Sequence, residues 1–172
     1  MGQQKTETTV KIEYPYINPK GSIDYVSIDN EYMAMAKKIA KKHSLDETMP
    51  TGSVIVKGGR MIGFGANGSD YHKNNVCERV RLNIPTGQGY DLCEGCHHKN
   101  HSEVSAIRQA KEDGNEKDLL GAELYLWGHW WCCEPCWSDM VENGISKVFL
   151  LKDSEVLFNK ADPGNIVGKQ FV

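Results

Sequence analysis

Apolar residues recur along this chain with two different periods, which predict helices and strands respectively. From Asp29 or Asn30, either of which would cap a helix, to about Lys42, apolar side chains fall three or four positions apart. The predicted helical face consists of Tyr32, Met35, Ala36, Ile39 and His43. The following stretch, "TGSVIVKGGRMIGFGANGS", predicts two strands joined by a hairpin turn at Gly58-Gly59.

The second half of the chain alternates helical and strand patterns. "HSEVSAIRQAKEDG" predicts a helix that stops at Gly114, and "AELYLWG" predicts a strand. A further helix is expected from Cys133 to about Asn143, ended by Gly144, and "KVFLL" is expected to form the next strand. The tail from Asp153 predicts one short helix and a final strand. Helices alternating with strands favour an α/β fold with helices packed on a mixed sheet.

The length of 172 residues fits one domain with a substantial core. Residues 1–28 are polar and predict an extended N-terminal arm lying on the domain. Residues 29–172 then form a single domain, which includes a long irregular loop at 68–100 that carries cysteines and histidines. The sequence contains no internal repeat and no low-complexity tract.

Charge and composition exclude several classes of protein. The net charge is -3, so the chain lacks the basic field that long nucleic-acid footprints require. No apolar run approaches the roughly 18 residues of a membrane span. The start, "MGQQKTETTV", lacks the apolar stretch of an export signal, so we expect a cytoplasmic protein. Six cysteines in such a chain predict metal ligands or reduced thiols rather than disulfides.

The segment "HWWCCEPCW" holds the most informative of these cysteines. Cys133 and Cys136 have the C-x-x-C spacing that lets two sulfurs bind one ion. Both fall at the start of a predicted helix, where the helix dipole favours thiolates, and on the same stripe as Trp137 and Met140. Cys132 faces another way and is predicted to be a small apolar core residue.

An upstream motif, "HSE", adds His101 and Glu103 at the start of another predicted helix. His101 with Cys133 and Cys136 gives three ligands and leaves the fourth tetrahedral position open, as in catalytic zinc sites. Glu103 is placed to reach a water at that open position without binding the metal. A lone C-x-x-C also occurs in structural zinc sites and redox pairs, but redox pairs usually follow a different βαβ context.

His101-Ser102-Glu103 followed by Cys133-Glu134-Pro135-Cys136 resembles the zinc-dependent cytidine/deoxycytidylate deaminase superfamily, and deoxycytidylate deaminases in particular, over roughly residues 50–152. The resemblance implies a three-layer α-β-α fold with a central mixed five-stranded sheet. It also implies that Glu103 moves protons during hydrolytic deamination. One departure concerns the proline that the family has before its first cysteine, because Cys132 stands at that position.

The resemblance implies a substrate and, through Asn67, one of its contacts, and the residue types suggest further contacts. The favoured reaction converts dCMP to dUMP with release of ammonia. Asn67 would contact the sugar, and Trp130 and Trp131 would stack on a base or fill the core beside the helix. Arg79 and Arg81 would offer guanidinium forks to a phosphate.

Two other functions stay open. One is a base deaminase acting on a polynucleotide, either tRNA adenosine or single-stranded DNA cytosine, which the two tryptophans would suit. The other is a non-catalytic zinc module. For the favoured reaction we expect a small-molecule nucleotide as partner, with no nucleic acid and no membrane, and relatives of this kind imply a homo-oligomer.

The loop at 68–100 predicts a second metal site. Cys77, Cys93 and Cys96 would bind a structural zinc together with a histidine, for which His98 is the expected choice. A metal would order a loop that has little core of its own. Some deoxycytidylate deaminases are similar in carrying a second zinc near this loop. The alternative is a set of reduced cysteines beside a solvated histidine pair.

Overall fold

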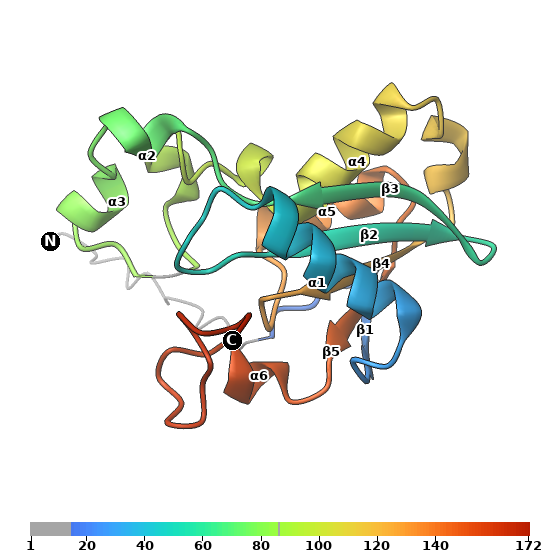
Figure 1. Ribbon diagram of the computed structural model, residues 1–172. Coiled ribbons are helices and arrows are strands. Elements are labelled where there is room, and N and C mark those ends of the chain that lie inside the picture. Colours follow the sequence, from blue (N-terminus) through green and yellow to red (C-terminus); the bar gives the residue numbers. More distant parts are fainter. Residues whose placement is uncertain (1–14, 86) are drawn as a thin grey trace, which may run out of the picture.

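A computed structural model describes residues 15–85 and 87–172, and its centre is a sheet of five strands in the order β1-β5-β4-β2-β3 (Figure 1). The strands are β1 Ser22–Val26, β2 Gly52–Lys57, β3 Arg60–Ala66, β4 Glu123–Trp127 and β5 Lys147–Leu151. β1, β5 and β4 are parallel, whereas β2 runs antiparallel to both β4 and β3. The mixed sheet predicted from the sequence is therefore confirmed.

The helices alternate with the strands along the chain. The α-helices are α1 Glu31–His43, α2 Tyr71–Asn74, α3 Glu78–Arg81, α4 Ser102–Glu112, α5 Glu134–Glu142 and α6 Ser154–Leu157. Short 3₁₀ turns are η1 Tyr90–Leu92, η2 His98–Asn100 and η3 Glu116–Leu119. No helix in the described residues is both long and apolar enough to cross a membrane.

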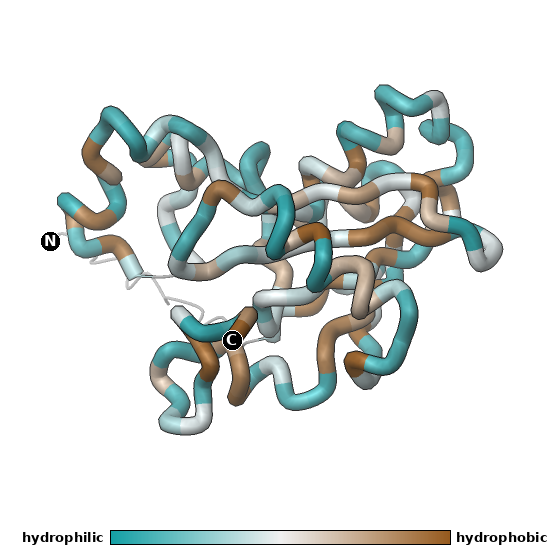
Figure 2. Tube along the Cα trace, in the orientation of Figure 1, coloured by the Kyte–Doolittle hydropathy of each residue, from teal (hydrophilic) through white to brown (hydrophobic). Residues whose placement is uncertain are grey.

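The sheet buries apolar side chains on both faces. Along β2, Val54 and Val56 point into one core, while Ile55 between them points into the other. α1 covers the first core, and α4 and α5 cover the second. In Figure 2 the central strands are the most continuously hydrophobic part of the chain, whereas the region between β3 and α4 is largely polar. The predicted three-layer α-β-α architecture is confirmed.

The fifth strand does not come from where the sequence pattern placed it. Residues 22–26, expected to belong to an arm, form the edge strand β1, which pairs in parallel with β5. The tail instead holds the short helix α6 and then turns, with no strand among its described residues. Polar residues alternate along "SIDYV" because an edge strand needs few apolar side chains, so its pattern resembled an arm. The first fourteen residues of that arm lie outside the described part of the chain.

The helix α1 is capped by Asn30, one of the two caps that the sequence offered, but its buried face is rotated from the expected one. The Asn30 side chain accepts hydrogen bonds from the backbone amides of Tyr32 and Met33, each at 3.0 Å. Met33, Ala36 and Ala40 are fully buried, whereas His43 is exposed. The alanines decide this rotation because they let the helix backbone lie directly on the sheet.

The packing of α4 against β3 is equally close. A Cβ at Gly65 would lie 2.4 Å from the Ala106 backbone nitrogen, and one at Gly63 would lie 2.7 Å from the Ala110 Cβ. Glycine at both positions therefore lets α4 settle directly on β3. This contact sets the position of the helix N-terminus at the end of the sheet.

Candidate metal centre and active-site cleft

Two helix N-termini meet at one end of the sheet, where β3 and β4 end and β2 begins. His101 is the N-cap residue of α4, and Cys133 is the N-cap residue of α5. Cys136 lies within the first turn of α5. The register that pairs Trp127, the last residue of β4, with Gly52, the first residue of β2, places both helix starts at the same edge.

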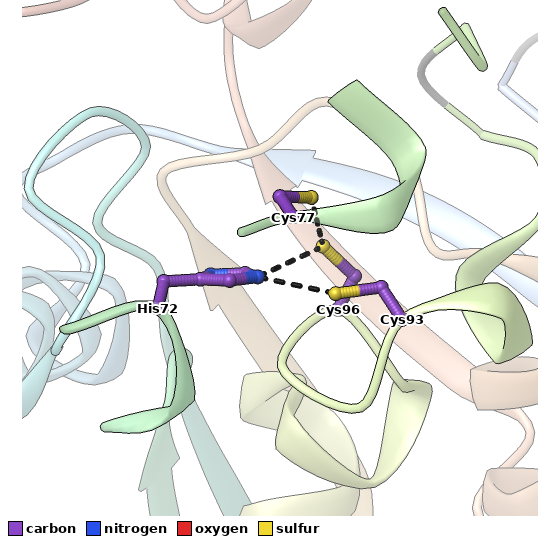
Figure 3. Close-up of side chains that lie close together, drawn as sticks. All are labelled: His72, Cys77, Cys93 and Cys96. Atoms are coloured by element: carbon purple, nitrogen blue, oxygen red, sulfur yellow. Dashed lines mark hydrogen bonds between the residues drawn. The ribbon is translucent and has the colours of Figure 1, made fainter. Parts of the chain in front are cut away.

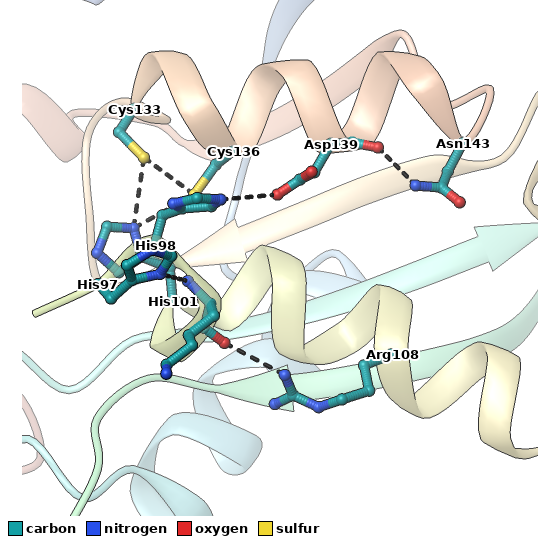
Figure 4. A network of polar contacts seen from close by, with 9 residues as sticks. His97, His98, His101, Arg108, Cys133, Cys136, Asp139 and Asn143 are labelled. Atoms are coloured by element: carbon teal, nitrogen blue, oxygen red, sulfur yellow. Dashed lines mark hydrogen bonds and ion pairs between the residues drawn. The ribbon is translucent and has the colours of Figure 1, made fainter. Parts of the chain in front are cut away.

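The side chains of His101, Cys133 and Cys136 converge on one point (Figure 4). His101 Nδ1 lies 3.2 Å from Cys136 Sγ and 3.4 Å from Cys133 Sγ, and the two sulfurs are 2.9 Å apart. Two thiols and one imidazole form a set of donors that zinc prefers, and three protein ligands leave one position open. The predicted set of ligands is thus brought together by the fold.

The electrostatics of this group favour a bound cation. The hydrogen bond shared with Cys136 lowers the pKa of Cys133 to about 6, against the opposing effect of burial and with further help from His101. Burial raises the pKa of Cys136, and its bond to Cys133 adds to this. Burial alone would lower the pKa of His101, but Cys133, Glu103 and the Cys96 backbone together raise it. A lowered pKa favours the thiolate form of Cys133, which is the form of cysteine that binds a metal.

Glu103 lies in the first turn of α4, next to the ligands but outside the three-residue group. It is only 5% exposed, and the Ser102 hydroxyl donates to its Oε2 at 3.2 Å. Ser102 in turn shares a 2.7 Å hydrogen bond with Ser53 on β2. A carboxylate fixed in this way beside three residues that could hold a metal ion is suited to accept and return protons.

A cleft of about 850 Å³ opens onto these residues. Its walls include His101, Glu103 and Cys133, and they extend to the loop after β3 and to the residues after α6. Of the residues predicted to contact a substrate, the cleft is lined by Asn67, Arg79, Trp130 and Trp131.

Residues 26–152 match the family described as the cytidine and deoxycytidylate deaminase zinc-binding region. The chain belongs to this family. The match spans the sheet from the end of β1, the cleft, both helix N-termini and the intervening loop. Family membership and the two groups of His and Cys side chains fit Zn²⁺ as the bound metal.

Several solved structures are similar to this deaminase-family chain. RibD of Acinetobacter baumannii (form 1) is 26% identical, with a TM-score of 0.40, over 69% of this chain. The chain spans only 26% of that protein's length. The apo dCMP deaminase of cyanophage S-TIM5 is 21% identical over 75% of this chain and 87% of its own, with a TM-score of 0.47. The guanine deaminase of Bacillus subtilis is 22% identical over 69% and 60%, with a TM-score of 0.42. No curated protein sequence matches the chain significantly.

Cys132 stands where the deaminase family resemblance places a proline, and the structure shows its surroundings. Its side chain is fully buried in the core shared by α4, α5 and the sheet, as predicted. It also hydrogen-bonds to Glu103, and burial together with that carboxylate raises the pKa of the thiol well above its usual value. Cys132 is therefore a neutral core residue that contacts the carboxylate rather than a metal ligand.

The carboxamide of Asn67 is bound mainly to the protein itself. Its Oδ1 accepts from Ser44 Oγ at 2.6 Å and from the Thr51 amide at 2.8 Å, and its Nδ2 donates to the Met49 carbonyl at 2.9 Å. Within the described part of the chain this leaves one amide hydrogen for a ligand. The residue therefore anchors the loop after α1 at the rim of the cleft.

The two arginines of α3 have different surroundings. Arg79 donates to the carbonyls of Gln88 and Pro85 and stacks 4.4 Å above the ring of Tyr90. Arg81 is more than half exposed, pairs with Glu78, and is not among the residues that line the cleft. Only Arg79 is placed where it meets the cleft.

Two further aromatic residues line the cleft, His129 and Tyr90, and no sequence motif predicted them. His129 Nδ1 accepts from the amides of Trp130 and Trp131 at 3.0 and 3.3 Å, which orders the loop before Cys133. Burial is the main cause that lowers the pKa of His129 to about 4, and the charge of nearby His101 adds to it. The ring of Tyr90 meets that of His101 edge-on at 4.7 Å. Neither residue belongs to a motif with a fixed spacing, so no local signal marked it.

A second group of ligand atoms lies in the loop between β3 and α4, and its histidine differs from the expected one. Cys77, Cys93 and Cys96 converge as predicted, but the fourth member is His72 (Figure 3). His98 instead lies 3.2 Å from Asp139 on α5 (Figure 4). The 3₁₀ turn that begins at His98 carries this residue toward α5, whereas α2 brings His72 to the cysteines.

Proposed function

We propose that this protein is a zinc-dependent hydrolytic deaminase that converts a cytosine nucleotide, dCMP in preference to others, to the uracil nucleotide and ammonia. The observation that carries the proposal is the position of Glu103. It is a buried carboxylate at the wall of the cleft, adjacent to three residues suited to hold one zinc ion.

In this proposal, His101, Cys133 and Cys136 would hold the ion, and three protein ligands would leave one position of a tetrahedral zinc open. A zinc ion bound there lowers the pKa of water, so that hydroxide is available near neutral pH. Glu103 takes a proton from the water and gives it to N3 of the cytosine ring. The oxygen of that water bonds to C4 as N3 is protonated. Glu103 then moves the remaining hydroxyl proton to the amino group, the C4–N bond breaks, and ammonia leaves with a carbonyl at C4.

The walls of the cleft favour an aromatic base that carries a phosphate. Trp130 and Trp131 supply aromatic faces near the proposed metal ligands. Their ring centroids are 6.2 Å apart and the rings are nearly perpendicular. Lys73, Arg79 and Lys160 bring positive charge to the same cleft. Cations at the rim support a nucleotide over a nucleoside.

The overall charge of -3 opposes a long polyanionic substrate. Among the described residues, Asp46 and Glu47 also line the cleft and would repel additional phosphates. Both features favour a mononucleotide over tRNA or single-stranded DNA.

A panel of substrates at matched zinc content tests the proposal. Ammonia release is measured for dCMP, deoxycytidine, cytidine, dCTP, adenosine and a short single-stranded DNA. We expect the highest kcat/KM with dCMP and a lower value with deoxycytidine. Activity confined to the oligonucleotide would overturn the substrate assignment. Inactivity toward the whole panel, with zinc bound, would identify a non-catalytic zinc module.

A further inference from the structure

His129 lines the cleft, yet the reaction proposed above gives it no part. It follows Gly128, which comes directly after the last residue of β4. Gly128 has a φ of 99°, and a Cβ there would lie 2.2 Å from the carbonyl oxygen of Pro50, so only glycine fits. The chain turns at this glycine and leaves His129 on the wall of the cleft, partly exposed.

The orientation of the His129 ring is fixed by its neighbours. Nδ1 accepts hydrogen bonds from the backbone amides of Trp130 and Trp131, at 3.0 and 3.3 Å. The ring of Trp131 meets the imidazole edge-on, with centroids 4.8 Å apart. Nε2 lies on the other side of the imidazole from Nδ1, so it faces away from these amides.

The contacts at Nδ1 also decide where the imidazole carries its proton. An atom that accepts amide hydrogens cannot carry a hydrogen itself, so the ring is neutral and is protonated at Nε2. The pKa of His129, lowered to about 4 mainly by burial, agrees with a neutral ring near pH 7. Nε2 is therefore an uncharged hydrogen-bond donor.

This donor has no acceptor within the described residues. The hydrogen bonds of His129 there involve Nδ1 alone. In the same part of the chain, Ser154 Oγ is the single fully buried polar side-chain atom that lacks a partner. Nε2 of His129 is therefore open to solvent at the cleft. A ligand that fills the cleft must supply an acceptor or leave the donor unpaired, which weakens binding.

His129 lies at the end of the cleft where the reacting base would sit. Its ring contacts that of Trp131, and Trp131 packs against Cys133 and Cys136, two of the proposed zinc ligands. The cations Lys73 and Arg79, which are suited to a phosphate, come from the loop after β3 instead. A neutral donor beside the proposed metal centre is suited to an uncharged acceptor on the base.

The bases that carry an amino group differ in the atom beyond the ring nitrogen that is protonated during deamination. In cytosine this nitrogen is N3, and the next ring carbon bears the carbonyl oxygen O2, an acceptor. In adenine the nitrogen is N1, and the next carbon bears only hydrogen. In guanine, attacked at its amino carbon, the nitrogen is N3 and the next atom is a ring-fusion carbon. Only cytosine has an acceptor there, and a site built around such a hydrogen bond rejects ligands that lack it.

We propose that His129 is a specificity-determining residue whose Nε2–H donates a hydrogen bond to O2 of the cytosine base. The contact selects cytosine over adenine and guanine at the same metal centre. It rests on the function proposed above, because it uses the orientation of the base in which Glu103 protonates N3.

Replacing His129 by asparagine removes the donor and keeps the order of the loop. The Oδ1 of asparagine can accept the same backbone amides as Nδ1, but the shorter side chain does not reach the position of Nε2. The substrates are dCMP and 2-thio-dCMP, in which sulfur, a weaker acceptor, replaces O2. We expect His129→Asn to lower kcat/KM for dCMP by about 10- to 100-fold and that for 2-thio-dCMP by less than about threefold.

His97→Asn is the matched control. His97 Nδ1 accepts from the Lys99 amide at 3.1 Å, a similar local bond, but His97 is not among the described residues that line this cleft. The control should keep both kcat/KM values. Equal losses on the two substrates in His129→Asn would assign His129 to the structure of the loop and overturn the contact.

The same assay separates failure of this contact from failure of the proposed function. A zinc-loaded wild type that is inactive on dCMP would overturn the function and the contact with it. An active wild type whose kcat/KM for dCMP is unchanged in His129→Asn would overturn the contact alone.

A measurement on the unaltered, zinc-loaded protein covers the case in which the variant fails to fold. Nitrogen-15 NMR should show His129, identified by its contact with the Trp131 ring, protonated at Nε2 and not at Nδ1. The Nε2 proton should shift when dUMP, a product that retains O2, is added to saturation. A ring protonated at Nδ1, or an Nε2 proton that dUMP leaves unchanged, would overturn the proposal.

Discussion

Replacing Glu103 by glutamine tests the proposed chemistry most directly. The amide has the shape of the carboxylate and can still accept the hydrogen bond from Ser102 Oγ, so the local packing is preserved. It cannot take a proton at neutral pH. The side chain is 5% exposed, which leaves bulk water little access to act in its place.

The size of the effect follows from the number of proton transfers assigned to this carboxylate. A positioned acid–base group contributes about 10²- to 10⁴-fold in rate. At about 1.4 kcal/mol per tenfold, this corresponds to about 3–6 kcal/mol in the activation barrier. Because Glu103 serves more than one transfer, we expect kcat to fall by at least about 10²-fold. Exchanging a charged acceptor for a neutral one should change unfolding stability by only about 1 kcal/mol.

The assay follows the loss of cytosine absorbance with dCMP, using wild type and variant with equal zinc content. Glu134→Gln is the matched control, because Glu134 is an exposed carboxylate in the first turn of α5, beside the same metal ligands. It should retain activity. A Glu103→Gln protein within about threefold of the wild-type rate would refute the role of Glu103, since a base is expected to contribute at least about 10²-fold. An equal loss in Glu134→Gln would attribute the effect to local charge.

Three further outcomes are expected. Cys133→Ala should lose the zinc ion proposed at His101, Cys133 and Cys136 and lower the melting temperature, whereas Cys132→Ala should keep that ion; metal analysis separates the two, and the reverse result would show that the ligands are misassigned. Gly65→Ala should destabilise the fold by about 1–3 kcal/mol in denaturant unfolding, because the new Cβ would lie 2.4 Å from the α4 backbone; an unchanged midpoint would contradict this contact. Arg79→Ala should raise KM for dCMP while Arg81→Ala should not, since only Arg79 lines the cleft, and equal KM values would remove Arg79 from phosphate binding.

The sequence alone determined the features that depend on short stretches of chain. The turn at Gly58-Gly59, with φ of 57° and 76°, follows from the residues themselves. His101 and Glu103 lie two residues apart at one helix N-terminus, and Cys133 and Cys136 share one turn at another. The spacing within each helix start does not depend on how the helices pack. The sequence could therefore predict these residues as candidate ligands, with Glu103 as the candidate acid–base group.

Only the tertiary structure decided the features that join distant segments. β1 became a strand because β5, more than a hundred residues away, offers it a parallel partner. The rotation of α1 was set by close contact with the sheet at Gly52, where a Cβ would lie 2.2 Å from the Ala36 carbonyl.

The choice of His72 over His98 has the same physical origin. Both histidines lie near the cysteines in sequence, but the path of the loop and the missing side chain at Gly95 bring only His72 to the sulfurs. The contact between the Cys96 backbone and His101 likewise depends on how the loop folds back onto α4. Local periodicity carries no information about such approaches, because they are fixed by packing between segments that the sequence keeps apart.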